Sequence, residues 1–339
     1  MIKAILKKLL FLFFSIIALA LAGFYLLNTQ WQSQLSFQEA SYEVKPGWSY
    51  YRIVQDLTQQ EQLEHAFPYK VFLWLNPQYR KIHAGHFVLP KQQLSFEQFM
   101  QALLKAEQVQ YKLTFVEGSH LKQWLAQLKQ APFIDKQLTN QDNKKALVKT
   151  ITGESVYPSL EGLLLPETYL YTKNITDQQV IKQAYLAMRH FLTSISAQIQ
   201  GQSLSEYEVL ILASIIEKET ALVSEMPLIS SVFHNRLNKG MRLQTDPTVI
   251  YGLGDRYKGD ITRAHLREKT AYNTYRIKGL PPTPIAMPSK QAILATLNPA
   301  QSDYYYFVAN GEGGHTFSKT LKEHNSAVKA YLKKQGHTN

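Results

Sequence analysis

The stretch that decides the fold is SEYEVLILASIIEKET at residues 205–220. Ser205 is followed three residues later by Glu208, a capping box that predicts the start of a helix. Residues 209–216 are apolar on every side of this helix apart from Ser214, so we expect it to lie at the centre of a folded domain. A carboxylate buried at the end of such a helix is costly unless it is paired or protonated, which makes the glutamates there candidate functional acids.

These glutamates, Glu217 and Glu219, cannot form a paired carboxylate dyad. They are two residues apart, about 200° around a helix, so they face nearly opposite directions. The helical neighbours of Glu217 are small: Ala213, Ser214, Thr220 and Ala221. Those of Glu219 are bulky and apolar: Ile215, Ile216, Leu222 and Val223. We therefore expect Glu217 on the floor of a groove, and Glu219 against the core with a basic partner such as Arg236 or Arg242. The alternative for Glu217 is an ion pair with a neighbouring lysine.

The composition bounds the class of protein. The chain has 339 residues, of which 45% are hydrophobic and 12% aromatic, so it can bury a large core and is not a disordered chain. A prior of about 150 residues per domain suggests two folded units. The absence of cysteine excludes disulfides, thiolate metal sites and cysteine nucleophiles, which leaves oxygen or nitrogen groups for any catalysis. The net charge of +11 favours nucleic acid, anionic lipid or an anionic polymer as a neighbour.

The N-terminus predicts a membrane anchor. Residues 9–27 are uncharged and long enough to span a bilayer as a helix. Lys3, Lys7 and Lys8 precede this stretch, and no lysine directly follows it. Residues 1–8 are therefore expected in the cytoplasm and the rest of the chain on the far side of the membrane. A cleavable signal peptide is the alternative, with cleavage sites at residues 18–20 or 20–22. Export in either form excludes nucleic acid as the natural partner.

The block at residues 41–107 has its own pattern. A strand at 42–44, a turn at 45–47, two amphipathic helices and a strand near 82–90 are expected in that order, with a further helix from Ser95. The order strand, helix, helix, strand is similar to the LysM family of glycan-binding modules.

The remainder of the chain is a mixture of strands and helices. A strand at 111–116 precedes a helix near 121–128, a polar surface excursion at 131–150 and a long helix at 177–199. Residues 244–248 are expected to form a polar loop with a turn at Asp246-Pro247. Beyond a stiff proline-containing loop at 279–285, Ser289 is expected to cap a helix that ends before residue 298.

No metal, cofactor or serine-hydrolase chemistry is indicated. His83 and His86 have a metal-like spacing without a third ligand nearby, so they are interpreted as turn residues. The glycines at 311–314 lack the Gly-Lys-Ser/Thr of a phosphate-binding loop, and no Gly-x-Ser-x-Gly motif is present.

Five segments together resemble the YceG-like family of endolytic murein transglycosylases. They are ASIIEKET at 213–220, RLQTDPTVIYG at 242–252, AYNTY at 271–275, GLPP at 279–282 and GGHTF at 313–317. The resemblance covers residues 41–335 and implies an α+β fold. It implies a single transmembrane helix at 9–27, a LysM-like module at 41–107 and a catalytic domain at 108–339. The implied location is the inner membrane, with the catalytic domain in the periplasm.

The resemblance also implies a reaction. Members cleave nascent peptidoglycan strands, and Glu217 in the Glu-Lys-Glu segment would be the catalytic acid and base. The β-1,4 bond between N-acetylmuramic acid and N-acetylglucosamine would break without water, leaving 1,6-anhydro ends and ending strand growth. Substrate-binding candidates are Gln244, Asp246, Tyr272, Asn273 and His315. Expected partners are glycan strands, the inner membrane and peptidoglycan synthases. The alternatives are a membrane-tethered glycan-binding scaffold and a hydrolysing muramidase.

Overall fold

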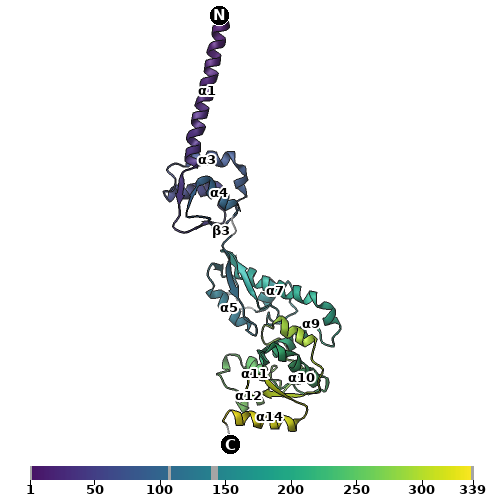
Figure 1. Cartoon of the computed structure of the whole chain (residues 1–339). Coiled ribbons are helices and arrows are strands. Elements are labelled where there is room, and N and C mark those ends of the chain that lie inside the picture. Colours follow the sequence, from purple (N-terminus) through teal and green to yellow (C-terminus); the bar gives the residue numbers. More distant parts are fainter. Residues whose placement is uncertain (1, 106–107, 139–143, 337–339) are drawn as a thin grey trace. The chain divides into compact units, whose positions relative to one another are not determined.

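The computed structural model describes residues 2–105, 108–138 and 144–336 (Figure 1). Two compact units are present: residues 1–111 with 172–174, and residues 112–171 with 175–339. Helices and short two-stranded ladders occur in both, so the expected mixed α+β architecture is confirmed.

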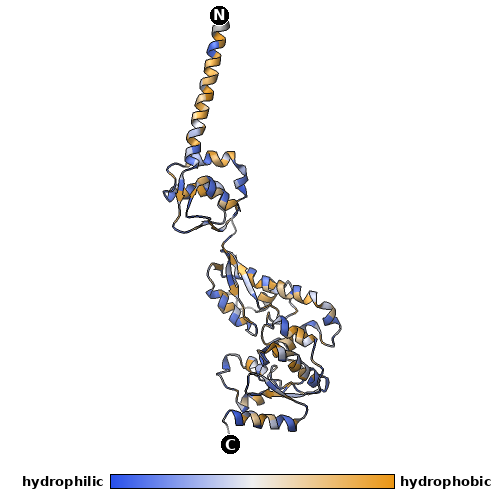
Figure 2. Ribbon diagram, viewed as in Figure 1, coloured by the Kyte–Doolittle hydropathy of each residue, from blue (hydrophilic) through white to orange (hydrophobic). Residues whose placement is uncertain are grey.

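The first unit begins with a long apolar helix, α1 (Ile2–Trp31). Its segment Ile5–Trp31 is long and apolar enough to cross a membrane, and Figure 2 shows the helix as almost continuously hydrophobic. The helix therefore extends beyond the predicted span at both ends. Its orientation in a membrane, and its cleavage or retention, stay predictions.

The rest of the first unit contains the predicted order of strand, helix, helix and strand. Strand β2 (Ser41–Val44) is followed by α2 (Tyr50–Gln59), α3 (Ala66–Leu75), the short helix η1 (Pro77–Lys81) and β3 (Gly85–Val88). Strands β2 and β3 pair antiparallel. A second antiparallel ladder, of β1 (Gln34–Ser36) with β4 (Gln93–Ser95), was not predicted, and α4 (Phe96–Lys105) follows it. The likeness to LysM modules stays a prediction.

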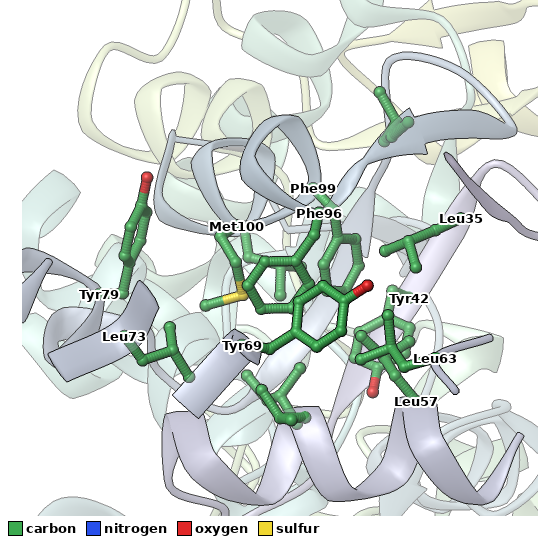
Figure 3. Packing of buried hydrophobic residues seen from close by; sticks show 14 of the residues in the cluster. Leu35, Tyr42, Leu57, Leu63, Tyr69, Leu73, Tyr79, Phe96, Phe99 and Met100 are labelled. Carbon is green, nitrogen blue, oxygen red and sulfur yellow. The ribbon is translucent and has the colours of Figure 1, made fainter. Parts of the chain in front are cut away.

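Aromatic and aliphatic side chains share the core of this unit (Figure 3). The rings of Tyr69 and Phe96 meet edge to face at 4.7 Å between centroids. Trp31, at the end of α1, is only 6% exposed and its indole donates to the carbonyl of Pro68 at 2.8 Å. The end of α1 is thus part of the folded unit.

The N-terminal part of the second unit contains both strands and helices. Strand β5 (Tyr111–Thr114) pairs with β7 (Thr168–Tyr171), and β6 (Ile134–Asp135) pairs in parallel with β8 (Ile175–Thr176). The helices of this part are α5 (Leu121–Gln130), α6 (Lys144–Thr152), α7 (Asp177–Ser194) and α8 (Ser196–Gln200).

The prediction of a polar surface excursion at 131–150 is wrong for the residues that the structure describes, because Ile134, Leu138 and Val148 are buried. Residues 139–143 lie outside the described part of the chain.

Helix α9 (Glu206–Glu219) is the central element of the second unit, as predicted. Ser205 and Glu208 form the expected capping box, and every residue from Val209 to Ile216 is buried. The helix packs against α10 (Met226–Asn238), α11 (Asp246–Leu253) and α13 (Lys290–Leu297). Smaller elements complete the unit: η2 (Val223–Glu225), η3 (Gly254–Arg256), α12 (Arg263–Arg267), the hairpin of β9 (Tyr306–Ala309) with β10 (His315–Ser318), and α14 (Leu321–Lys334).

The prediction of a polar loop at 244–248 is wrong in its second half. Asp246 and Pro247 form the first turn of α11 rather than an isolated turn. Proline suits this position because the first helical turn has no use for its missing N–H, and an aspartate there interacts favourably with the helix dipole.

Candidate active site

The last turn of α9 presents its two glutamates to different parts of the second unit. Glu217 contacts the segment that leads into α13, whereas Glu219 contacts the segment that leads into α11. The two carboxyl groups therefore have separate environments, as the helical geometry predicts.

Glu217 completes the N-terminus of α13. Its Oε2 accepts hydrogen bonds from the backbone N–H of Ser289, at 3.0 Å, and from the Ser289 hydroxyl. The same hydroxyl accepts from the N–H of Ala292 at 3.1 Å, so Ser289 caps α13 as predicted. A negative charge beside a helix N-terminus is stabilising. The geometry thus gives Glu217 a clear structural role.

The chain itself covers part of the space expected beside Glu217, which is half-buried. Ser214, one of the small helical neighbours, accepts a hydrogen bond from the N–H of Ile285 at 2.9 Å. The segment from Ile285 to Ser289 is buried and lies against this face of α9. The small side chains of α9 allow close packing of that segment. From the sequence alone, small neighbours could equally indicate such packing or room for a ligand.

Glu219 has the more unusual electrostatic environment. Burial raises the pKa of its carboxyl to about 7, and the nearby charge of Asp246 acts in the same direction. A hydrogen bond from the Thr245 hydroxyl to Oε1 opposes the increase, as do the charges of His315 and Arg236. The side chain nevertheless keeps some accessible surface. A carboxyl with a pKa near neutrality can both donate and accept a proton at physiological pH.

The expected arginine partner of Glu219 is absent among the described residues. Arg236 instead donates to the backbone carbonyls of Leu243 and Tyr305, each at 2.6 Å. Its charge still favours the ionised form of Glu219 from a distance. Because no ion pair fixes the carboxylate, burial determines the direction of the pKa shift.

Three buried threonines hold the donor to Glu219 in place. The N–H of Thr245 donates to the hydroxyl of Thr274 at 3.0 Å. The hydroxyl of Thr248 donates to the Thr245 carbonyl at 2.8 Å and lies 2.8 Å from the Thr274 hydroxyl. This network fixes the backbone of Thr245 and directs its side chain toward Glu219.

Gln244 and Asp246 flank Thr245 and are exposed. Gln244 has a φ of 53°, in the left-handed region that a residue with a side chain rarely adopts. Asp246 accepts a hydrogen bond from the Tyr275 hydroxyl at 2.6 Å. Burial and this hydrogen bond both raise the pKa of Tyr275, so its hydroxyl stays a donor. Both predicted residues therefore lie beside Glu219 rather than beside Glu217.

His315 reaches the surroundings of Glu219 from the start of β10. Its Nδ1 lies 2.7 Å from Oε2 of Glu225, and its backbone N–H donates to Oε1 of the same carboxyl at 2.9 Å. Burial alone would raise the pKa of Glu225, but the contacts with His315 outweigh it and lower the pKa. Glu225 thus orients the imidazole, and His315 in its protonated form lowers the pKa of Glu219.

Tyr272 and Asn273 have internal partners. The amide nitrogen of Asn273, which is 1% exposed, donates to three backbone carbonyls, the shortest at 2.7 Å: those of His265, Leu266 and Glu268. Its oxygen accepts from the N–H of Tyr275. The Tyr272 hydroxyl lies 2.9 Å from that of Thr283. These residues hold the segment around α12 and the proline-containing loop in place, and the structure brings neither amide end of Asn273 to the surface.

Sequence reasoning missed three contributors to this site. Thr245 and Thr274 stood within quoted motifs, and a threonine before Asp-Pro is a signal for a helix start that was not used. Glu225 offered no signal, because it pairs with a histidine 90 positions away.

Comparisons with known proteins agree with the fold and with the motifs. The model of the YceG-like family matches residues 42–330. The endolytic murein transglycosylase of Bacillus subtilis is 35% identical over 237 residues, which cover 66% of this chain and 65% of that protein. The protein of the same name from Streptococcus pneumoniae strain D39 is 29% identical over 286 residues, covering 75% of this chain and 51% of that protein.

A crystal structure of a YceG-like protein from Listeria monocytogenes superimposes with a TM-score of 0.54 at 30% identity, covering 86% of this chain and 99% of that one. The matched region spans only 51% to 65% of the length of the two curated relatives. The family model, however, covers most of the residues after the N-terminal helix. The chain therefore belongs to the YceG-like family.

Proposed function

We propose that this protein is an endolytic murein transglycosylase, a lyase that cuts peptidoglycan glycan strands internally. The bond broken is the β-1,4 bond between N-acetylmuramic acid and N-acetylglucosamine, and the new end is 1,6-anhydro-N-acetylmuramic acid. The relatives named endolytic murein transglycosylase support the reaction class. The single observation that carries the chemistry is the carboxyl of Glu219, whose pKa burial raises to about 7.

One carboxyl suffices for this reaction. In the first step it donates its proton to the glycosidic oxygen, which leaves as the 4-hydroxyl of N-acetylglucosamine. The resulting carboxylate then accepts the proton of the muramic acid C6 hydroxyl, while that oxygen forms a bond to C1. No water is consumed, and the enzyme ends in its initial protonation state. A pKa near the working pH serves both steps.

Glu219 fits this role better than Glu217, which the sequence motif favoured. The Oε2 of Glu217 is occupied by both donors of Ser289 and is needed at the start of α13. Each glutamate has donors on one oxygen only among the described residues, but Glu219 lies in the neighbourhood of Asp246, His315 and Gln244. We therefore propose Glu219 for the acid and base role, and the role of Glu217, the residue that the sequence motif favours, stays a prediction that the digest below tests.

The surrounding groups have roles that follow from their charge. Asp246 is exposed, so its carboxylate can stabilise the positive charge that develops on the sugar ring as the bond breaks. His315, held by Glu225, and the exposed amide of Gln244 can orient the N-acetyl substituents. Tyr272 and Asn273 act as supports for the loops around the site.

The apolar helix α1 supports a location of this reaction at a membrane. We propose a cytoplasmic N-terminus, with both folded units on the periplasmic side of the inner membrane. Strands would then be cut close to the bilayer, where peptidoglycan synthases extend them. The proximity makes a synthase the expected protein partner.

A digest of purified glycan strands by the full-length protein tests the proposal. Mass spectrometry should detect 1,6-anhydro ends, and Glu219→Gln should reduce their rate of formation by about 10²-fold or more. The matched control is Glu217→Gln, which should keep most of the activity of the folded protein. Reducing ends would instead identify a hydrolase, and strand binding without cleavage by the parent protein would identify a scaffold. An inactive, normally stable Glu217→Gln beside an active Glu219→Gln would return the role to Glu217.

A further inference from the structure

The outward face of helix α3 is apolar and has no covering in the described structure. Phe67 is 71% exposed, Trp74 is 67% exposed and Leu75 is 48% exposed. They recur at the spacing that places residues on one side of a helix, and Val71, at the same spacing, is half-buried against the core. The opposite side is the core side, with three buried residues: Tyr69, Phe72 and Leu73. A helix that is apolar on both sides needs a second apolar environment.

The position of α3 is fixed to the end of the membrane-spanning candidate α1. The Trp31 indole donates to the carbonyl of Pro68 at 2.8 Å, and its ring meets that of Phe72 at 5.2 Å. The Tyr69 hydroxyl donates to the carbonyl of Gln30 at 3.1 Å. Figure 1 shows α3 lying across the end of α1, on the side of the first unit from which α1 leaves.

The depth of α3 follows from helix geometry. A hydrocarbon layer of about 30 Å is filled by about 20 helical residues, which corresponds to residues 9–27. Trp31 lies four residues further on, a rise of about 6 Å. The polar headgroup layer on each side is about 5–7 Å thick. If α1 spans the bilayer, Trp31 and the helix packed on it therefore stand at the level of the headgroups.

We propose that α3 binds the bilayer that α1 crosses, with Phe67 and Trp74 inserted among the lipids of the outer surface. This proposal rests on the membrane anchoring proposed above. Aromatic side chains favour this layer because their rings are apolar and their edges tolerate water. The charged residue of α3 is a single exposed lysine, Lys70, which suits contact with anionic headgroups and can extend its amine toward them.

The consequence is a defined orientation for the first unit. A single spanning helix leaves the attached unit free to rotate about the helix axis. A second contact, along the membrane surface, removes that freedom and turns one chosen face of the unit toward the lipid. Helix α3 is thus an interaction surface for the membrane, distinct from the proposed catalytic groups of the second unit.

The chain contains no cysteine, so single labelling sites can be introduced in the full-length protein. Two variants place a label on the outward face of α3: Trp74→Cys and Phe67→Cys. Each is labelled with an environment-sensitive fluorophore and reconstituted in vesicles of phosphatidylethanolamine and phosphatidylglycerol. The matched control is Val88→Cys, an exposed apolar position (52%) on β3, which Figure 1 places at the opposite end of the unit. Leu21→Cys reports on α1 itself.

The proposal predicts that labels at 67 and 74 are quenched by lipid-borne quenchers and are about threefold less sensitive to aqueous iodide than the label at 88. Equal iodide sensitivity at 74 and 88, with lipid quenching at 21, overturns the α3 contact and leaves the anchor standing. Protection from iodide without lipid quenching identifies a protein cover and also overturns the lipid contact. Failure of lipid quenching at 21 overturns both, and none of these outcomes depends on enzymatic activity.

Discussion

At the scale of single residues, the raised pKa of Glu219 predicts the pH dependence of the reaction. The protonated form is needed for the first step, and it is lost as the pH rises through about 7. We expect kcat/KM to fall tenfold per pH unit above this value. The rate of anhydro-end formation between pH 5 and 9 measures this decrease, which is the alkaline limb of the pH profile. A rate that is flat across pH 7 would exclude Glu219 as the acid.

Two substitutions should move that limb in opposite directions. Thr245→Val removes a hydrogen bond that lowers the pKa of Glu219, so the limb should move to higher pH. Asp246→Asn removes a negative charge that raises the same pKa, so the limb should move to lower pH. Shifts of about 0.5–1 pH unit are expected for each. The pH profiles of both variants, compared with the parent, provide the measurement, and shifts of the same sign would contradict the assignment.

The two glutamates should also differ in their effect on stability. The folded-state pKa of Glu219 lies above its ordinary value of 4.5, so the native state binds this proton more tightly than the unfolded state does. Stability is therefore highest below about pH 4.5 and falls as the pH rises to about 7. Glu219→Gln should increase the free energy of unfolding by about 1–3 kcal/mol at pH 8 and change it little at pH 4.

Glu217→Gln should act in the other direction. Loss of the charge beside the start of α13 should lower the free energy of unfolding by about 1 kcal/mol. Thermal melts of both variants at pH 4 and 8 measure the contrast. A Glu219→Gln variant less stable than the parent at pH 8 would show that the neutral form is not the favoured one.

The limits of sequence reasoning at this scale are visible in these two residues. The periodicity of α9 correctly placed the glutamates on different sides of one helix. It could not show which segments would cover each side. The small neighbours of Glu217 are covered by residues 285–289, and the donor to Glu219 is Thr245, 26 positions away. Local spacing carries no information about such contacts, because they are set by the packing of distant segments.

At the scale of elements, Gly162 joins two loops that frame α9. Its φ is 76°, and an added Cβ would overlap the ring of Pro284. Gly162→Ala should therefore destabilise the protein by about 3 kcal/mol or more, through the unfavourable φ and the clash together. A decrease in Tm of about 6–12 °C is the expected readout. Gly313→Ala is the matched control, because its φ is 87° but no atom lies within 4 Å.

Asn273 holds its part of the structure together by hydrogen bonds, whereas Gly162 does so by close packing. Asn273→Ala leaves three backbone carbonyls without their donor and should cost about 2–3 kcal/mol. We expect a lower Tm together with reduced activity at temperatures where the protein is folded, because the loops around the site lose their support. Asn273→Asp should behave alike, since a carboxylate cannot donate. Normal stability with lost turnover would instead indicate direct contact with the substrate.

The elements themselves were largely predictable where local signals are strong. The capping box at Ser205 and the cap at Ser289 each mark a boundary that the structure contains. The start of α11 was missed because Asp-Pro signals both an isolated turn and a first helical turn, and the dipeptide itself does not distinguish them. The buried residues between 131 and 150 were missed because they are scattered among polar ones, and their burial depends on α7 and β8.

At the scale of the whole molecule, the charge around α1 predicts its orientation. Lysines precede the apolar stretch, so the positive-inside rule places the N-terminus in the cytoplasm. A C-terminal phosphatase reporter, active only after export, should be active on the parent chain. Replacement of Lys3, Lys7 and Lys8 by glutamate should reduce that reporter activity several-fold. High reporter activity in the substituted chain would show that these charges do not set the orientation.

Fractionation of cells that express the parent chain distinguishes a membrane anchor from a cleaved signal peptide. An anchored protein stays full-length in the membrane pellet after an alkaline wash. A chain cleaved after residue 20 or 22 is shorter by mass and soluble. Because Trp31 is buried in the first unit while residues 5–26 of α1 are almost wholly uncovered, either outcome preserves the folded part.

The hydrogen bonds from Ser289 to Glu217 have a consequence for genetic surveys of this protein. A growth-based scan would score many substitutions of both glutamates as harmful, with Glu217→Gln an exception, and would present the two positions as a single catalytic motif. The two failures have different causes, because substitutions at 217 weaken the joint between α9 and α13, while those at 219 remove the proposed acid. Growth at reduced temperature, or extra copies of the gene, should therefore rescue substitutions at 217 and leave those at 219 defective.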